Sequence, residues 1–390
     1  MLKIALVTDT FYPQLNGVAN AVNTIATNLR KKGHKVHIFA PGVRGYKEKN
    51  KDITRFLSFK VPFFPEELRL PIPIPYKNIW QLLTTDADLI HAHGNSFFSL
   101  VGLFVARMRR KPYLLTFHTL WSEYTHYVLR GKVIKPSHVG FLFKLYSALC
   151  DEVITPSEKM RAELVKYGVS KAIHVIPNSV LLSRFENIKT KDYLYKRLHI
   201  PTTSPILLSV GRLGKEKNFG FVLEVFKEVS KTNTDTQLVI IGIGPEEKRL
   251  RRRVEELILQ DRVHFTGRVD PKEMPLAYAS ASIFVFASVT EVHPLVILEA
   301  AAAGLPFVVV DDKAFQNAVI PGVNGYSLVL KKEIFAEKIN KLLNDPELCK
   351  QFGQASKRII KENFHEDTLL EKLIDVYHKS LKDKHIFFEK

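Results

Sequence analysis

The chain has 390 residues and a hydrophobic content of 46%, which is ordinary for a globular protein and long enough for two domains. Its two cysteines, Cys150 and Cys349, exclude a disulfide framework and a cysteine-based metal cluster, and they favour a reducing cytoplasm. No apolar run reaches membrane-spanning length, and we expect the opening residues 1–7 to form a strand rather than a signal peptide.

The formal net charge of +17 is spread unevenly along the chain. Residues 1–180 contain 25 Lys and Arg against 12 Asp and Glu, a net of +13, whereas the remainder has 32 against 28, a net of +4. This asymmetry indicates an acidic partner for the first half. Nucleic acid is not favoured as that partner, because no recognised binding module is present and no aromatic side chains alternate with the basic ones.

Strand-like runs alternate with helical patterns in chain order, which predicts parallel βαβ units. In the first half we expect strands at 3–8, 35–40, 89–93 and 113–116, with helices at 17–32 and 96–110. In the second half we expect strands at 206–210, 237–242, 263–266, 283–286 and 307–310, each followed by a helix. The sequence therefore predicts an α/β protein with two Rossmann-like, doubly wound domains at 1–182 and 205–365. Residues 183–204 form the predicted linker, and 366–390 the predicted C-terminal helix.

Two glutamates eight positions apart form the first candidate site. Glu291 and Glu299 lie in Ser288-Val-Thr-Glu-Val-His-Pro-Leu-Val-Ile-Leu-Glu299. If Glu291 ends a loop and Glu299 lies two turns into a helix, backbone N–H groups at the helix start face an anion between them. A carboxylate at each end can then bind vicinal hydroxyls, which suits a sugar nucleotide.

A second candidate site follows the strand predicted at 206–210. The segment Gly211-Arg-Leu-Gly-Lys-Glu-Lys-Asn218 leads from this strand into a helix expected at 219–229. The planar guanidinium of Arg212 and the point charge of Lys217 suit a diphosphate.

Together and in this order, the two motifs resemble those of the retaining GT-B glycosyltransferases of family 4. The resemblance extends to Phe11-Tyr-Pro-Gln-Leu-Asn-Gly-Val18, Thr116-Phe-His-Thr119 and Ile176-Pro-Asn-Ser-Val180. It implies two Rossmann-like domains facing a central cleft, with the C-terminal helix returning to the first domain. Pro294 departs from the glycine usual in the family and lacks an N–H donor.

The resemblance also implies the roles of individual residues in transferring a sugar from a nucleoside diphosphate with retained configuration. Arg212 and Lys217 are expected to stabilise the departing diphosphate, and Glu291 and His118 to contact the transferred sugar. Glu299 is expected at the ribose. The remaining residues expected at the nucleotide sugar are Gly17, Asn178, Gly211 and Leu295.

No metal or other cofactor is expected. Asp86-Ala-Asp88 matches a metal-binding DxD string, but Asp88 directly precedes a strand and more simply caps or turns the chain. His91 and His93 face the same side of that strand and lack further ligands at recognisable spacing.

The acceptor side resembles the diacylglycerol glucosyltransferase subgroup in its aromatic and histidine-rich turn, which contains Trp121, Tyr124, His126 and Tyr127. The proline-broken apolar segment 61–75 lies upstream of the basic cluster Arg107, Arg109, Arg110 and Lys111, and we expect both to dock on the inner face of the cell membrane.

The resemblance thus implies a peripheral membrane enzyme that uses a UDP-sugar, with glucose as the hexose and 1,2-diacylglycerol as the acceptor. Two alternatives remain open at this point: a family 4 enzyme with a soluble carbohydrate or polyprenyl-linked acceptor, and a non-catalytic sugar-nucleotide-binding module.

Overall fold

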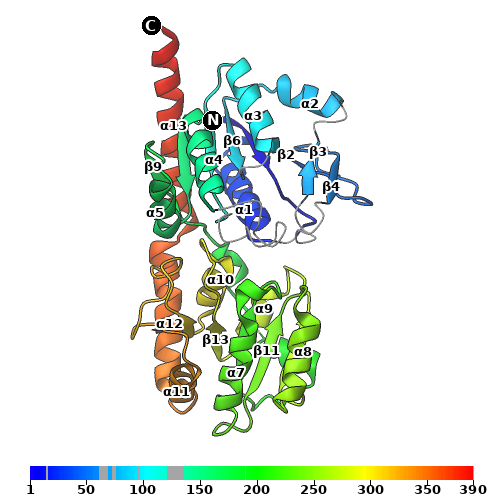
Figure 1. Ribbon diagram of the computed structural model, residues 1–390, viewed down its shortest axis with the longest axis vertical. Coiled ribbons are helices and arrows are strands. Elements are labelled where there is room, and N and C mark those ends of the chain that lie inside the picture. The colour runs from blue at the N-terminus through cyan, green and yellow to red at the C-terminus, as the bar shows by residue number, and fades with distance from the viewer. Residues whose placement is uncertain are drawn as a thin grey trace. The chain divides into compact units, whose positions relative to one another are not determined.

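The computed structural model describes residues 1–14, 16–60, 69–72, 76–94, 97–120, 136–188 and 190–389. The chain divides into two compact units (Figure 1). Unit 1 comprises Met1–Ser179 together with Glu366–Lys390, and unit 2 comprises Val180–His365.

Unit 1 is built on a parallel sheet of seven described strands in the order β3-β2-β1-β6-β7-β8-β9. The chain winds outward from β1 in one direction and then from β6 in the other, so the sheet is doubly wound. A short antiparallel ribbon joins β4 and β5. The elements are β1 (Lys3–Thr8), α1 (Gly17–Lys31), β2 (Lys35–Pro41), β3 (Ile53–Phe56), β4 (Ser58–Lys60), β5 (Arg69–Pro71), α2 (Tyr76–Leu83), β6 (Leu89–His93), α3 (Phe97–Met108), β7 (Tyr113–Thr116), α4 (Pro136–Leu149), β8 (Glu152–Thr155), α5 (Glu158–Lys166), β9 (Ile173–Val175) and α13 (Glu366–Glu389).

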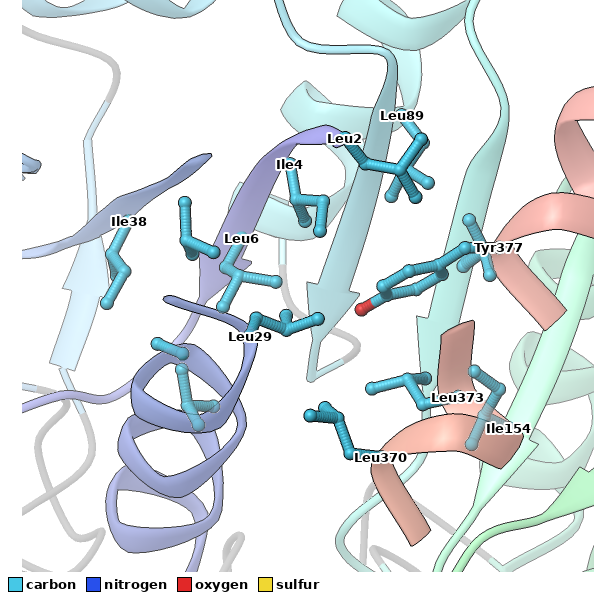
Figure 2. Close-up of a cluster of buried hydrophobic side chains, with 14 of the residues drawn as sticks. Leu2, Ile4, Leu6, Leu29, Ile38, Leu89, Ile154, Leu370, Leu373 and Tyr377 are labelled. Atoms are coloured by element: carbon cyan, nitrogen blue, oxygen red, sulfur yellow. The ribbon is translucent and has the colours of Figure 1, made fainter. Parts of the chain in front are cut away.

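The first and last helices of unit 1 cover one face of this sheet. Ile4 and Leu6 of β1 share a buried cluster with Leu29 of α1 and with Leu373 and Tyr377 of α13 (Figure 2). Each such buried aliphatic side chain contributes about 1.5–3 kcal/mol to folding. The C-terminal helix is therefore an integral part of the core of unit 1.

Unit 2 contains a second doubly wound parallel sheet, in the order β12-β11-β10-β13-β14-β15. Its elements are η3 (Leu182–Arg184), α6 (Tyr193–Leu198), β10 (Ile206–Val210), η4 (Lys215–Lys217), α7 (Phe219–Val229), β11 (Gln237–Ile241), α8 (Glu247–Glu256), β12 (Val263–Gly267), α9 (Met274–Ala279), β13 (Ile283–Phe286), α10 (Leu295–Ala303), β14 (Phe307–Val310), β15 (Gly325–Leu328), α11 (Lys332–Leu343) and α12 (Pro346–Asn363).

The predicted α/β class with two doubly wound domains is confirmed, with three differences in detail. Residues 183–204 are not a plain linker, because they contain most of η3 and all of α6 and belong to unit 2. Strand β14 leads to β15 without an intervening helix. Glu299 is the fifth residue of α10, so it lies just over one turn into the helix rather than two.

Candidate active site

The two sequence motifs of unit 2 meet because their strands are neighbours. Strands β10 and β13 pair in parallel, with Leu208 opposite Phe284. The chain continues from β10 toward β11 and from β13 toward β14, on opposite sides of this pair. The loops after β10 and β13 therefore emerge together at the switch point, where doubly wound sheets bind their ligands.

The turn after β10 is held by the glycine turn after β11. Gly211 donates its N–H to the carbonyl of Ile241 at 3.0 Å, and Leu213 donates to that of Ile243 at 3.0 Å. Gly242 has φ +145°, and a Cβ at this position would collide with the carbonyl oxygen of Gly211. Glycine is thus required for the close approach that fixes the Arg212 turn.

Arg212 is positioned by a carboxylate that the sequence analysis did not single out. Its Nη2 donates to Oε1 of Glu216, a buried residue of η4. The four-residue spacing between Arg212 and Glu216 was the available signal. This ion pair orients the guanidinium in the turn.

Lys217 and Glu291 form an ion pair between the two motifs, 74 positions apart in sequence. Their side chains are 18% and 9% exposed. Ser288 Oγ lies 2.5 Å from Oε1 of the same carboxylate and 3.2 Å from the carbonyl oxygen of Glu216. The two predicted site residues, Lys217 and Glu291, are thus in direct contact. Ser288 connects them to the Arg212 turn.

Helix α10 begins directly after this point. Pro294 is its N-cap and Leu295 its first residue. The first N–H groups of an α-helix have no intrahelical acceptor and attract anions. Leu295, four residues after Glu291, therefore contributes a backbone donor at the start of the helix, and Pro294 contributes none.

Glu299 is bound by Tyr278, a residue with no recognisable sequence signal. Tyr278 donates its hydroxyl to Glu299 Oε2 at 2.9 Å. Loss of solvation raises the pKa of Glu299, although the hydrogen bond from Tyr278 and the positive charge of Arg184 partly oppose this. A carboxylate held through one oxygen keeps its other oxygen available for hydroxyl groups.

The residues of unit 2 thus provide two cations, a helix start and two carboxylates at one end of a sheet. Cations and backbone donors bind diphosphate oxygens, whereas carboxylates accept hydrogen bonds from sugar hydroxyls. The chemistry of this group matches a nucleoside diphosphate sugar.

Unit 1 contains a cluster of three histidines at the carboxyl ends of its strands. His118 follows β7, and its Nε2 lies 3.0 Å from Nδ1 of His93 at the end of β6. His91 lies beside His93, with ring centroids 4.1 Å apart, and hydrogen-bonds Thr116 and Tyr377 at 2.7 and 2.8 Å. His118 is thus oriented by a partner that the sequence analysis treated only as a rejected metal ligand.

Burial keeps this cluster neutral. It lowers the pKa of His91 to about 3 and that of His118 to about 4. It also lowers the pKa of His93, and the neighbouring histidines add to that effect. A neutral imidazole at His118 can donate or accept a hydrogen bond at a sugar hydroxyl.

Two further predicted residues lie in unit 1. Asn178 and His118 line the same small pocket, together with His91 and Thr116. Gly17 is the first residue of α1, and Asn16 caps that helix by accepting from the N–H of Ala19. A Cβ at Gly17 would meet nothing within 4 Å. Within the described part of unit 1, no steric contact therefore requires glycine at this helix start.

The predicted acceptor residues are described only in part. The basic cluster lies at the end of α3 and just beyond it, and Arg107 contacts Asp151 and the carbonyl of Leu149. Trp121, Tyr124, His126 and Tyr127 lie outside the described residues, as does most of segment 61–75. None of the helices in the described part of the chain has the length and apolar content needed to cross a bilayer.

The DxD string is engaged in the fold of unit 1. Asp88 Oδ2 accepts from the N–H of Lys3 at 2.7 Å, and the exposed Asp86 pairs with Lys3 Nζ at 2.6 Å. Within the residues that the structure describes, no group of three His, Cys, Asp or Glu is arranged to hold a metal ion. Asp88 thus links the start of β6 to the start of β1, because its own N–H also donates to the carbonyl of Lys3 at 2.7 Å.

Comparison with known proteins agrees with this geometry. The family described as Glycosyltransferase Family 4 matches residues 15–184, and the one described as Glycosyl transferases group 1 matches residues 191–359. The chain is 31% identical to the alpha-monoglucosyldiacylglycerol synthase of Streptococcus pneumoniae, over 96% of this chain and 82% of that protein. The alpha-monoglucosyldiacylglycerol synthase of Acholeplasma laidlawii is 26% identical, over 98% and 100%.

A solved structure shares the arrangement of elements. Anabaena Alr3699/HepE, crystallised in complex with UDP-glucose, has a TM-score of 0.78 at 17% identity, over 97% of this chain and 100% of that one. Two family descriptions cover most of the sequence, and a relative above 30% identity aligns along nearly all of it. The protein therefore belongs to the group 1 and family 4 glycosyltransferases, and it is a transferase of the GT-B fold.

Proposed function

We propose that this glycosyltransferase moves glucose from UDP-glucose to 1,2-diacylglycerol and retains the α configuration. The observation that carries the proposal is the Lys217–Glu291 ion pair, which joins the cation that we assign to the diphosphate to the carboxylate that we assign to the sugar. Glucose and diacylglycerol are supported by the two related synthases, whose names specify a monoglucosyl product on diacylglycerol. UDP is the nucleotide of the HepE complex, a protein with the same fold.

The chemical step requires charge to be stabilised on the departing diphosphate. Arg212 and Lys217 supply this stabilisation, helped by the N–H groups at the start of α10. Glu216 holds the guanidinium in place before the donor binds, so little reorganisation is needed during the reaction. Each charge-assisted hydrogen bond contributes about 1.5–3 kcal/mol, which corresponds to roughly ten- to hundredfold in rate if it forms mainly in the transition state.

The carboxylates and the histidine position the donor. Glu291 binds hydroxyls of the transferred glucose, Glu299 binds the ribose, and neutral His118 contacts the glucose. Gly17, Asn178 and Gly211 allow the backbone and a side-chain amide to approach the donor. The leaving phosphate accepts the proton of the acceptor hydroxyl on the same face of the sugar, as the family resemblance implies, so no separate general base is assigned.

We further propose that transfer needs no metal and takes place at the inner face of the cell membrane. The two carboxylates of the DxD string are bound to Lys3, and Arg212 and Lys217 already supply the positive charge that a metal would provide. A diacylglycerol acceptor lies in a bilayer, and the +13 charge of residues 1–180 suits an anionic leaflet.

The test is incubation with labelled UDP-glucose, UDP-galactose and GDP-mannose, each with diacylglycerol vesicles, soluble sugars or a polyprenyl phosphate. We expect glucosyl-diacylglycerol from UDP-glucose, with the rate unchanged by EDTA. Product only on soluble sugars or polyprenyl phosphate would replace the acceptor, and activity that needs added manganese would refute the metal-free proposal. Donor binding without turnover on any acceptor would indicate a non-catalytic sugar-nucleotide-binding module.

A further inference from the structure

Helix α3 carries a row of exposed apolar side chains along one face. Leu100, Phe104 and Met108 repeat every four residues and therefore share that face, and they are 41%, 62% and 58% exposed. The opposite face is buried at Leu103, and Gly102 lies against Val7 of β1. One face of the helix is thus packed in the core, and a second apolar face is exposed to solvent.

Helix α4 repeats this arrangement. Phe141, Leu145 and Leu149 are also spaced by four residues and are exposed, with Leu142 beside them. Val139, Phe143 and Tyr146 fill the core on the other side. The two helices meet at their ends, where Arg107 Nη2 donates to the carbonyl of Leu149 at 2.5 Å. We call the seven exposed residues Leu100, Phe104, Met108, Phe141, Leu142, Leu145 and Leu149 the α3–α4 surface.

The two helical segments that carry this surface have charged side chains of one sign only. Residues 97–111 and 136–150 contain no Asp or Glu. They contain five cations, namely Arg107, Arg109, Arg110, Lys111 and Lys144. Arg107 reaches Asp151, which lies just beyond α4. An apolar surface edged by cations matches a layer whose interior is apolar and whose boundary is anionic.

We propose that the α3–α4 surface is the membrane-contact face of unit 1. Its phenylalanines and leucines enter the boundary between headgroups and acyl chains of an anionic leaflet, while the flanking cations contact lipid phosphates. The inference rests on the proposed lipid acceptor and identifies the surface that brings the enzyme to it. Trp80, 63% exposed on the adjoining helix α2, is a residue type enriched at membrane interfaces.

A second copy of the chain is a poorer occupant of this surface. Symmetric pairing places the same patch of each copy against the other. Arg109, Arg110, Lys111 and Lys144 of each copy would then face the same cations of the other copy, and helices α3 and α4 contain no acidic residue to offset them. Like charges in an interface oppose association. An anionic bilayer complements the same cations.

The first experiment removes the apolar side chains and keeps every charge. The triple variant Phe104→Ser, Phe141→Ser and Leu145→Ser is compared with a matched control, Ile258→Ser, Val329→Ser and Leu330→Ser, which removes three exposed apolar residues from unit 2. Vesicles contain phosphatidylglycerol, phosphatidylcholine and diacylglycerol. We expect at least a tenfold loss of the vesicle binding that survives high salt in the first variant and none in the control. Equal salt-resistant binding by the triple variant and the parent would overturn the proposal.

The second experiment keeps the apolar surface and adds a fluorescent probe to it. A tryptophan is introduced as Phe141→Trp or, as the control, Ile258→Trp, and quenching by brominated lipids is measured relative to the parent. We expect added quenching only from Phe141→Trp. Added quenching from neither variant, or from Ile258→Trp alone, would refute insertion through this surface.

The outcomes separate the inference from the proposed function. A parent protein that binds vesicles through this surface but glucosylates no diacylglycerol would support the contact face and refute the acceptor. A parent that makes the glycolipid while the triple variant binds vesicles equally well would refute the contact face alone. A parent dimer that the triple variant converts to a monomer in sedimentation would assign the surface to a second copy and overturn the inference.

Discussion

Lys217 and Glu291 come from separate motifs, yet one ion pair joins them. Ser288 also hydrogen-bonds the Glu291 carboxylate. The ion pair therefore orients Lys217 before a donor binds. Preorganisation of this kind lowers the cost of stabilising charge as it develops. The same pair gives the lysine a structural role, so a useful experiment must separate catalysis from folding.

Replacement of Lys217 by alanine should reduce glucosyl transfer at least tenfold, because one charge-assisted contact to the leaving diphosphate is lost. Arg212→Ala and Glu299→Ala should have effects of at least the same size. Steady-state turnover and circular dichroism measure activity and fold. The matched control is Lys215→Ala, which removes an exposed lysine of the same 3-10 helix and should stay within about twofold of the parent. Near-parental turnover in all three site variants would remove the donor assignment.

The histidine cluster of unit 1 predicts a dependence of stability on pH. His91 is fully buried, and burial lowers its pKa to about 3, whereas an unfolded histidine titrates near 6.5. The unfolded state therefore takes up the proton first, so stability is lost as the pH falls from about 6.5 toward the folded pKa. From pH 7 to pH 5 this amounts to about 2 kcal/mol.

Denaturant unfolding of the parent and of His91→Gln at these two pH values measures the effect. We expect the loss of stability between pH 7 and pH 5 to be about 2 kcal/mol smaller in the variant. An identical loss in both proteins would mean that His91 is not kept neutral by burial.

Single side-chain partners were the least predictable part of the site. The sequence predicted Arg212, Lys217 and Glu291 in strand-to-helix turns and Glu299 in the helix after the second turn, because apolar runs that end in glycine or polar loops are visible locally. Tyr278, which binds Glu299, was not predictable, because its contact depends on how α9 packs against α10. The partnership of His93 with His118 was missed for a similar reason, since it requires the pairing of β6 and β7.

At the scale of elements, the hydrophobic pattern predicted most of the strands that are buried on both faces, although β8 was missed despite being buried at all four residues. The expected bounds of β1, β6, β7, β10, β13 and β14 match the structure. Strand β15 was missed, because Gly325–Leu328 is short and only its first residue is buried. The linker was misjudged for a related reason: the six-residue helix α6 offers too few turns for a clear hydrophobic repeat.

The basic end of α3 predicts an electrostatic contribution to membrane binding. Replacing Arg107, Arg109, Arg110 and Lys111 by glutamine should weaken binding to anionic vesicles most strongly at low salt, because exposed charges are screened over about 8 Å at physiological ionic strength. Donor hydrolysis should not change. Sedimentation with vesicles over a salt series measures this.

The matched control replaces Lys248, Arg249, Arg251 and Arg252 of α8 by glutamine, which removes the same charge from unit 2. If both quadruple variants lose vesicle binding equally, total charge rather than the end of α3 governs docking.

At the scale of the whole molecule, the two doubly wound sheets and the comparisons with known proteins indicate the same fold and family. The donor and the acceptor of the reaction are to be tested by experiment. Two doubly wound sheets bring their functional loops to the switch points, and this topology is common to enzymes with many donors and acceptors. Glucose and galactose differ in one stereocentre, and no residue pattern in the sequence distinguishes them. Only the product reveals what the site selects.

The most direct test of the proposed reaction is the anomeric configuration of the lipid product. The purified protein is incubated with UDP-glucose and diacylglycerol vesicles, and the glycolipid is isolated and examined by proton NMR for the coupling constant of its anomeric proton. We predict a single α-linked glucose on the free hydroxyl of 1,2-diacylglycerol. A β-linked glucose would contradict retention, and failure to form any glucosyl-diacylglycerol would contradict the proposed function.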